Sequence, residues 1–141
     1  MAYAVKQDII DRYGEDAFYS AFDWDGIDDV DDTVVDTALE GASDEIDGYL
    51  AGRYTLPLQT IPRILILQCV DIALYRGSGV SGASQTEEKK ERYDDAIKYL
   101  LKVAEGKISL GIEKPSQGGS GGSAFSSNDR LFTRETMKGI L

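Results

Sequence analysis

The residues that come nearest to a chemical site lie in the acidic segment 23–29, which reads DWDGIDD. Carboxylates around a glycine resemble part of a calcium-binding EF-hand loop. If Gly26 takes the sixth position of that loop, Ala21 falls at the first, which requires an oxygen ligand, and Asp32 falls at the twelfth, which is normally glutamate. The eighth position, normally apolar, falls on Asp28. The spacing therefore favours an acidic turn that begins the next helix, and we expect no metal here.

Other catalytic chemistry has few residues to use. The chain contains no histidine, which excludes Ser-His and Cys-His nucleophile pairs and the usual imidazole metal sites. Its one cysteine, Cys69, lies in an apolar stretch, where a free cysteine usually behaves as a small buried hydrophobe. Carboxylate acid–base pairs remain open, but 25 Asp and Glu residues produce close pairs by chance. We therefore expect neither an enzyme nor a bound cofactor.

The charge of the chain is unevenly divided. Residues 1–48 hold 15 acidic and two basic side chains, a net of −13, whereas residues 49–141 hold 10 acidic and 13 basic ones. A solvated acidic face is one interpretation, and a polar molecule whose acidic side meets the basic side of a neighbour is another. The acidic excess argues against a dedicated nucleic-acid-binding protein, which would carry a basic patch.

The length of 141 residues fits one domain. The first residues lack the basic and apolar regions of a signal peptide. The longest apolar stretch, residues 61–75, is interrupted by polar side chains and is shorter than the roughly 20 residues that span a bilayer. We therefore expect a soluble protein with no membrane partner.

Hydrophobic periodicity predicts a mainly α-helical, four-helix bundle-like domain over residues 1–112. Besides a short helical turn at residues 15–22, helices are expected over residues 5–13, 33–53, 62–76 and 84–105. Asp31 or Asp32 is expected to cap the second of these, and the pattern of Ser84 to Glu87 is typical of a capping box.

Two of these helices supply the predicted core. The helix over 33–53 repeats apolar residues at threes and fours, and glycines at 41, 48 and 52 suggest close packing. The helix over 62–76 is apolar on nearly every side, which predicts either a central, buried position or burial against a second subunit. Residues 77–84 are expected to form a loop. The predicted core and interface residues are Ile46, Tyr49, Leu67, Val70 and Leu74.

The character of the chain changes after Gly106. Residues 107–112 alternate enough to predict a short strand. Residues 113–124 are dominated by glycine and serine and predict a tether that cannot build a core. Residues 125–141 regain apolar content, and we expect this extended C-terminal arm to dock on another chain, with folding back on its own domain as the alternative. The residues expected to bind are Phe125, Arg130, Leu131, Phe132 and Arg134.

Residues 44–58, DEIDGYLAGRYTLPL, resemble the signature stretch of a family of small acidic proteins from Mu-like tailed bacteriophages and prophages. Matching features follow in the same order along nearly the whole chain. They are DIALYR at 71–76, RYDDAI at 92–97, GKISLG at 106–111, and a looser match in FS at 125–126 and FTR at 132–134.

This family is similar to the head–tail connector, or adaptor, proteins of long-tailed phages. The resemblance implies a helical protein without catalytic residues that forms a homo-oligomeric ring, commonly a dodecamer, at the head–tail junction of the virion. Its implied partners are the portal protein and tail or neck proteins, with genomic DNA passing through the channel without specific binding. The alternative is a small regulatory protein that binds one partner through its C-terminal arm. A third hypothesis is a hydrolase that works through carboxylates, and it would need a pocket that contains an acid with a shifted pKa.

Overall fold

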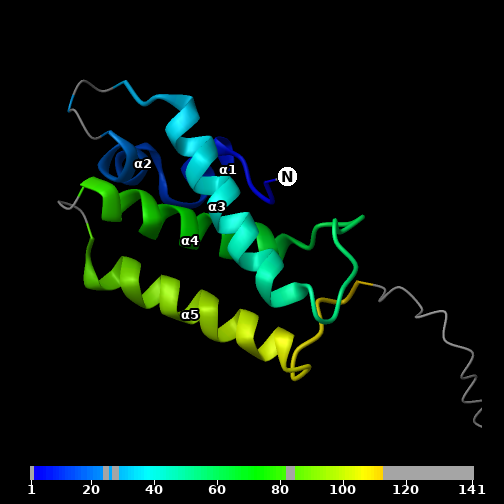
Figure 1. The fold of residues 1–141 in the computed structure, drawn as a ribbon. Coiled ribbons are helices and arrows are strands. Elements are labelled where there is room, and N and C mark those ends of the chain that lie inside the picture. Colours follow the sequence, from blue (N-terminus) through cyan, green and yellow to red (C-terminus); the bar gives the residue numbers. More distant parts are fainter. Residues whose placement is uncertain (1, 24–25, 27–28, 82–84, 113–141) are drawn as a thin grey trace, which may run out of the picture.

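The computed structural model describes residues 2–23, 26, 29–79 and 85–112, together with the backbone of residues 80 and 81. This part of the chain is mainly helical, as predicted, and no strand occurs in it. Five helices follow one another (Figure 1): α1 (Lys6–Tyr13), α2 (Glu15–Phe22), α3 (Asp32–Leu50), α4 (Arg63–Ser81) and α5 (Glu87–Ala104).

Helix α4 is the centre of the bundle. It packs against α1, α2, α3 and α5, and Figure 1 shows α3 crossing in front of it with α5 below. Val70 and Ile72 are fully buried although residues two apart lie on opposite sides of a helix. A helix that is apolar all round needs such complete cover, so the predicted central position is confirmed.

The predicted loop after Arg76 is wrong in its first half, because α4 continues to Ser81. Gly77 is buried, and a Cβ built on it would lie 2.9 Å from Cδ1 of Phe22 and closer still to Cε1. The next residue, Ser78, donates its hydroxyl to the carbonyl of Leu74 at 2.8 Å. This glycine therefore allows α2 to approach α4 closely and does not end the helix.

The glycines in and just after α3 have no such role among the described residues. A Cβ added at Gly41, Gly48 or Gly52 would meet no neighbouring atom within 4 Å. The predicted close packing at these glycines is therefore wrong for the described residues. Gly41 and Gly48, which lie inside α3, therefore cost helix propensity without a packing contact among the described residues.

Helix starts follow local capping chemistry. Asp31 caps α3, as expected, because its carboxylate accepts the N–H of Thr33 at 2.9 Å. Thr86 caps α5 by accepting the N–H of Lys89 at 3.3 Å, so the helix begins later than the predicted box, whose Ser84 lies outside the described residues. In the acidic segment, Asp23 accepts the N–H of Gly26 at 2.9 Å, and most of its other residues also lie outside the described ones.

Residues 107–112 form bends, so the predicted short strand is wrong. The N–H groups of Lys107 and Ile108 donate to the carbonyl of Lys102, at 2.9 and 3.3 Å, and close the end of α5. The N–H of Leu110 donates to the hydroxyl of Tyr54 at 3.1 Å. The backbone groups that a strand would use are thus taken by the helix end and by a tyrosine.

Candidate functional site

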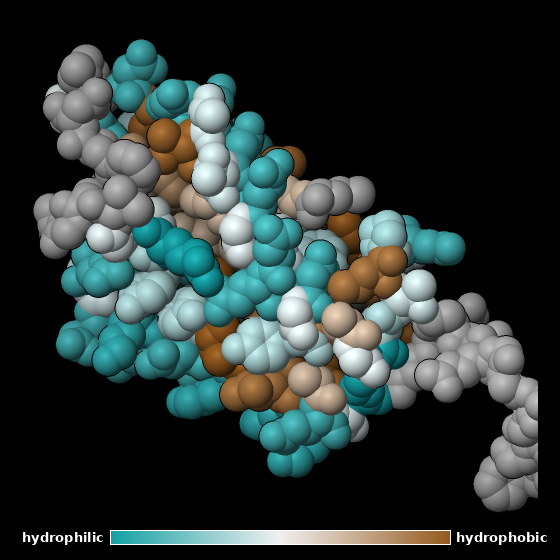
Figure 2. All heavy atoms as spheres, in the orientation of Figure 1, coloured by the Kyte–Doolittle hydropathy of each residue, from teal (hydrophilic) through white to brown (hydrophobic). Residues whose placement is uncertain are grey.

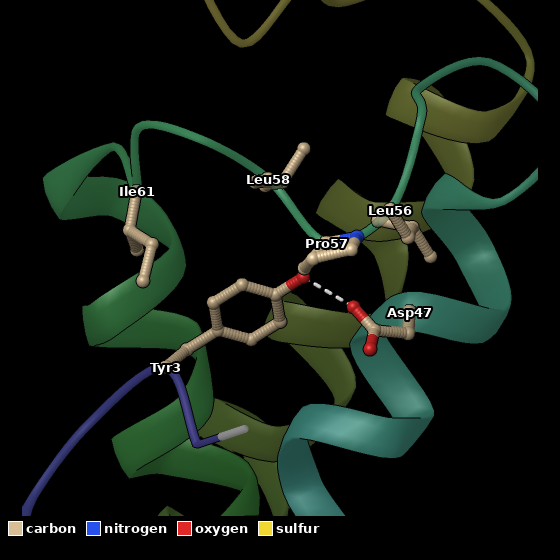
Figure 3. Close-up of a pocket in the computed structure, with 6 residues that line it drawn as sticks. All are labelled: Tyr3, Asp47, Leu56, Pro57, Leu58 and Ile61. Atoms are coloured by element: carbon tan, nitrogen blue, oxygen red, sulfur yellow. Dashed lines mark hydrogen bonds between the residues drawn. The ribbon is translucent and has the colours of Figure 1, made fainter.

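A pocket of about 290 Å³ opens between the start of the chain, the last turns of α3 and the connector before α4. Figure 3 shows the Tyr3 side chain reaching across the pocket toward α3. The lining residues are Tyr3, Asp47, Leu56, Pro57, Leu58 and Ile61.

The connector displays apolar side chains because it cannot continue the helix. The carbonyl of Leu50 accepts the N–H groups of both Arg53 and Tyr54 at 2.9 Å, which ends α3 in a tight turn. Pro57 and Pro62 then disfavour helix in the residues before them. Leu56, like Leu58 and Ile61, is consequently left half-buried on the edge of the core.

The one carboxylate of the pocket belongs to Asp47, whose Oδ1 accepts the hydroxyl of Tyr3. Tyr3 is itself anchored, because its N–H donates to Oγ of Ser43 at 2.9 Å. Burial and the neighbouring Asp47 raise the pKa of Tyr3 above its usual value, so the phenol stays neutral. Among the described residues, no further hydrogen bond reaches Oδ2 of Asp47.

These features suit binding better than catalysis. The walls are mostly apolar, and the hydroxyl of the neutral Tyr3 already donates its hydrogen bond to Asp47. The remaining carboxylate oxygen can accept a cation or an N–H donor at the edge of the pocket. The pocket therefore fits an apolar side chain that has a basic or N–H group beside it.

A second polar cluster surrounds Asp71 on α4. Its Oδ1 accepts the hydroxyl of Tyr13, its Oδ2 pairs with Arg12 at 3.2 Å, and the Arg92 guanidinium lies 4.4 Å from the centre of the Tyr13 ring. Burial raises the pKa of the Asp71 carboxyl even though these neighbours favour its charged form. Both oxygens are occupied, so the cluster ties α1 and α5 to α4 and offers no free group.

A third cluster is centred on Glu45 of α3. Its Oε2 accepts from Arg76, with Nε at 3.1 Å, and its Oε1 accepts the hydroxyl of Tyr93 at 2.9 Å. The Tyr93 ring stacks on Tyr75 with 4.5 Å between ring centres. Burial, with the Glu45 carboxylate adding to it, raises the pKa of Tyr93 to about 12. This cluster joins α3, α4 and α5 and again uses its polar groups internally.

The predicted core residues lie together in most cases. Ile46, Val70 and Leu74 are buried in one cluster, and Tyr49 is half-buried against it. Leu67 is half-buried and lies outside the cluster, so it is not part of the core among the described residues, and its place at an interface stays a prediction.

Cys69 is a core residue, as predicted. It is fully buried, its sulfur lies 3.4 Å from Oγ of Ser43, and burial raises the pKa of the thiol. Within the described ranges, no three His, Cys, Asp or Glu side chains gather in a way that could hold a metal ion. No helix in those ranges is long and apolar enough to cross a membrane.

The five predicted arm residues, from Phe125 to Arg134, lie outside the described residues. No pattern in the sequence identified this pocket, most of whose residues lie between the predicted helices over 33–53 and 62–76. The signal was the density of large apolar residues in a short segment bounded by prolines, which no core helix or strand could absorb.

The comparisons with known proteins agree with the resemblance. The chain is 34% identical over 141 residues to the Mu-like prophage FluMu protein gp36 of Haemophilus influenzae, covering 99% of this chain and 98% of that protein. It is 39% identical over 83 residues to Gene product J of Escherichia phage Mu, covering 59% of this chain and 57% of that protein. A family model described as Bacteriophage Mu, Gp36 matches residues 3–127. The chain therefore belongs to the Gp36 family of bacteriophage Mu and its relatives.

Proposed function

We propose that this phage protein is a structural virion component, a head–tail connector that forms a ring between the portal and the tail. The pocket carries the proposal, because it is a docking surface built largely by the stretch that resembles the phage family. Asp47, Leu56, Pro57 and Leu58 all belong to residues 44–58. In the clusters around Asp71 and Glu45, each carboxylate oxygen already accepts a hydrogen bond from another helix, so these groups serve the fold and no enzymatic activity is part of the proposal.

The surface charge supports an assembly role. Asp36, Glu40 and Asp44 are exposed at four-residue spacing along α3, and none of them has an ion pair with another described residue. Like charges at this spacing destabilise a helix by about 0.2–0.5 kcal/mol per pair. Figure 2 shows hydrophilic side chains over the part of this face that α3 occupies. A role in assembly would account for this row of acidic side chains, either in contact with a basic partner or along a channel for DNA.

A carboxylate-lined channel suits the passage of DNA. Phosphates are repelled by carboxylates, so the nucleic acid passes without binding. Basic side chains that could contact another copy lie on α5, which carries five basic and five acidic side chains, whereas α3 is strongly acidic. In the proposed ring, the acidic side of one copy faces either the channel or the basic side of the next copy.

The mass of the assembled protein tests the proposal. A connector forms large closed rings, alone or with the portal protein, and electron micrographs should show those rings at the neck of the particle. The alternative, a regulatory protein that binds one partner through its arm, forms a small complex of fixed low mass. A small complex together with complete particles that lack the protein would contradict the connector.

A further inference from the structure

We propose that the pocket beside Tyr3 and Asp47 receives residues 130–134 of the C-terminal arm of a neighbouring copy. This inference rests on the proposed function, because it requires copies held side by side. A ring with a head-to-tail interface needs two different surfaces on each copy, one that gives and one that receives. The arm and the pocket supply that pair.

The size of the pocket fits a side-chain anchor. A space of about 290 Å³ lies at the lower limit of ligand-binding pockets, which are roughly 300–1,000 Å³. One or two large side chains fill such a space, whereas a cofactor needs more. The arm offers Leu131 and Phe132 next to each other, and the lining residues Leu56, Leu58 and Ile61 give an apolar contact for them.

The charge beside the pocket fits the residues that flank this anchor. Leu131 and Phe132 stand between Arg130 and Arg134 in the sequence RLFTR. Oδ2 of Asp47 has no hydrogen bond among the described residues, and an arginine pairs well with a carboxylate oxygen. The apolar anchor thus matches the apolar pocket walls, and the adjacent guanidinium matches the Asp47 carboxylate.

The arm begins at the same end of the molecule as the pocket. Leu110 is hydrogen-bonded to Tyr54 at 3.1 Å, and Tyr54 lies three residues before Pro57 of the pocket. Figure 1 shows the last described residues, up to residue 112, near the connector between α3 and α4. The arm therefore begins at the edge of the bundle that carries the pocket.

The tether is long enough to reach a neighbour. Residues 113–130 number 18, which as a Gly/Ser-rich coil span roughly 21–25 Å and fully extended roughly 60 Å. A domain of this size has a radius of gyration of about 13 Å. The arm can thus leave its own domain and reach the next one, and a ring that engages many arms together gains avidity from weak single contacts.

Disulfide trapping between two full-length variants tests the inference. One copy carries Leu58→Cys in the pocket, and the other, with a tag that changes its mass, carries Phe132→Cys in the arm. Cys69 can stay because it is fully buried, and the wild type shows its background. Docking raises the local concentration of the two thiols, so we expect the mixed dimer to form roughly tenfold or more faster than for an undocked pair.

Gln59→Cys is the matched control, because Gln59 is exposed on the same connector and does not line the pocket. Ile61→Cys, at another lining residue, repeats the test in case Leu58→Cys weakens docking. Equal trapping rates at the pocket and control positions would overturn the inference. It is also overturned if trapping occurs only within a single chain that carries both cysteines, since the arm then fills its own pocket.

The failure of this inference and that of the connector proposal are distinguishable. Closed rings without trapping at the pocket refute the docking and leave the connector standing. Trapping between copies that never close into rings supports the docking and counts against the connector. Asp47→Asn keeps an acceptor for Tyr3 but removes the charge, so trapping should slow at low salt and lose most of that difference at high salt. An unchanged rate would remove Asp47 from the contact and overturn that part of the inference.

Discussion

Two glycines inside helices make opposite predictions at the scale of single residues. Gly77→Ala forces a Cβ into the buried ring of Phe22, and such overpacking costs typically about 1–3 kcal/mol. Gly48→Ala adds a Cβ in open space, so α3 gains roughly 0.5–1 kcal/mol of helix propensity. Chemical denaturation of the two variants measures both effects. A stabilised Gly77→Ala variant would show that α2 does not press on α4 as described.

Tyr93 makes the stability depend on alkaline pH. Its pKa is about 12 in the folded protein and 10.0 as an unperturbed tyrosine, because burial and Glu45 disfavour the phenolate. The stability that this shift contributes is therefore fully present below pH 10 and is lost as the pH rises from 10 toward 12. We expect the free energy of unfolding, measured by denaturation at each pH in this range, to fall less steeply with pH for Tyr93→Phe than for the wild type. The variant starts from a lower stability because it loses a hydrogen bond.

Two further tyrosines set the background for this measurement. Tyr3 and Tyr13 also have raised pKa values through burial and a hydrogen bond to an aspartate. The Tyr93→Phe variant must consequently keep part of the alkaline slope. Equal slopes for the variant and the wild type would contradict the assignment to Tyr93.

At the scale of the helices, α4 offers a matched pair of leucines. Leu74→Ala removes a side chain that is 2% exposed within the core cluster and should cost about 2–5 kcal/mol. Leu67→Ala, two turns earlier, removes a half-buried side chain outside that cluster and should cost about 1 kcal/mol. Equal losses in free energy of unfolding would mean that Leu67 is covered in the isolated protein.

The helices themselves were predictable because their apolar spacing is local. Val35 and Leu39 mark the core face of α3, and both are buried. The errors fall where distant residues decide the local structure. Gly77 alone suggests the start of a loop, but its close contact with Phe22 of α2 explains a glycine inside the helix. Residues 107–112 alone suggest a strand, but the hydrogen bond from Leu110 goes to the side chain of Tyr54.

The candidate site was hidden for the same reason. Its residues come from position 3, position 47 and the connector at 56–61, and only folding brings them together. Periodicity cannot signal a site assembled from segments so far apart. The resemblance did include most of these residues, but as a signature and without a geometry.

At the scale of the whole molecule, the uneven charge acquires a structural meaning. The 15 acids of residues 1–48 lie mainly on and before α3, which forms one outer face of the bundle, while α4 and α5 carry a more balanced charge. In the proposed ring, this polarity would favour contacts that bring the acidic side of one copy to the basic side of the next. We therefore expect the proposed assembly to weaken with added salt, since exposed charges are screened over roughly 8–10 Å at physiological ionic strength.

The C-terminal arm is the last part of the molecule to be tested, by truncation before Glu113. The described residues of the core cluster, from Tyr3 to Leu110, pack against one another, so we expect the truncated protein to remain folded and helical, with a thermal transition close to that of the full chain. It should nevertheless fail to join the particle, because the proposed rings depend on many arms engaging together. Circular dichroism measures the first outcome and incorporation into purified particles the second.

Truncated protein that still builds heads accepting tails would make the arm dispensable. An unfolded truncation product would instead show that the arm packs on its own domain, and the head-to-tail exchange of arms would then have no basis.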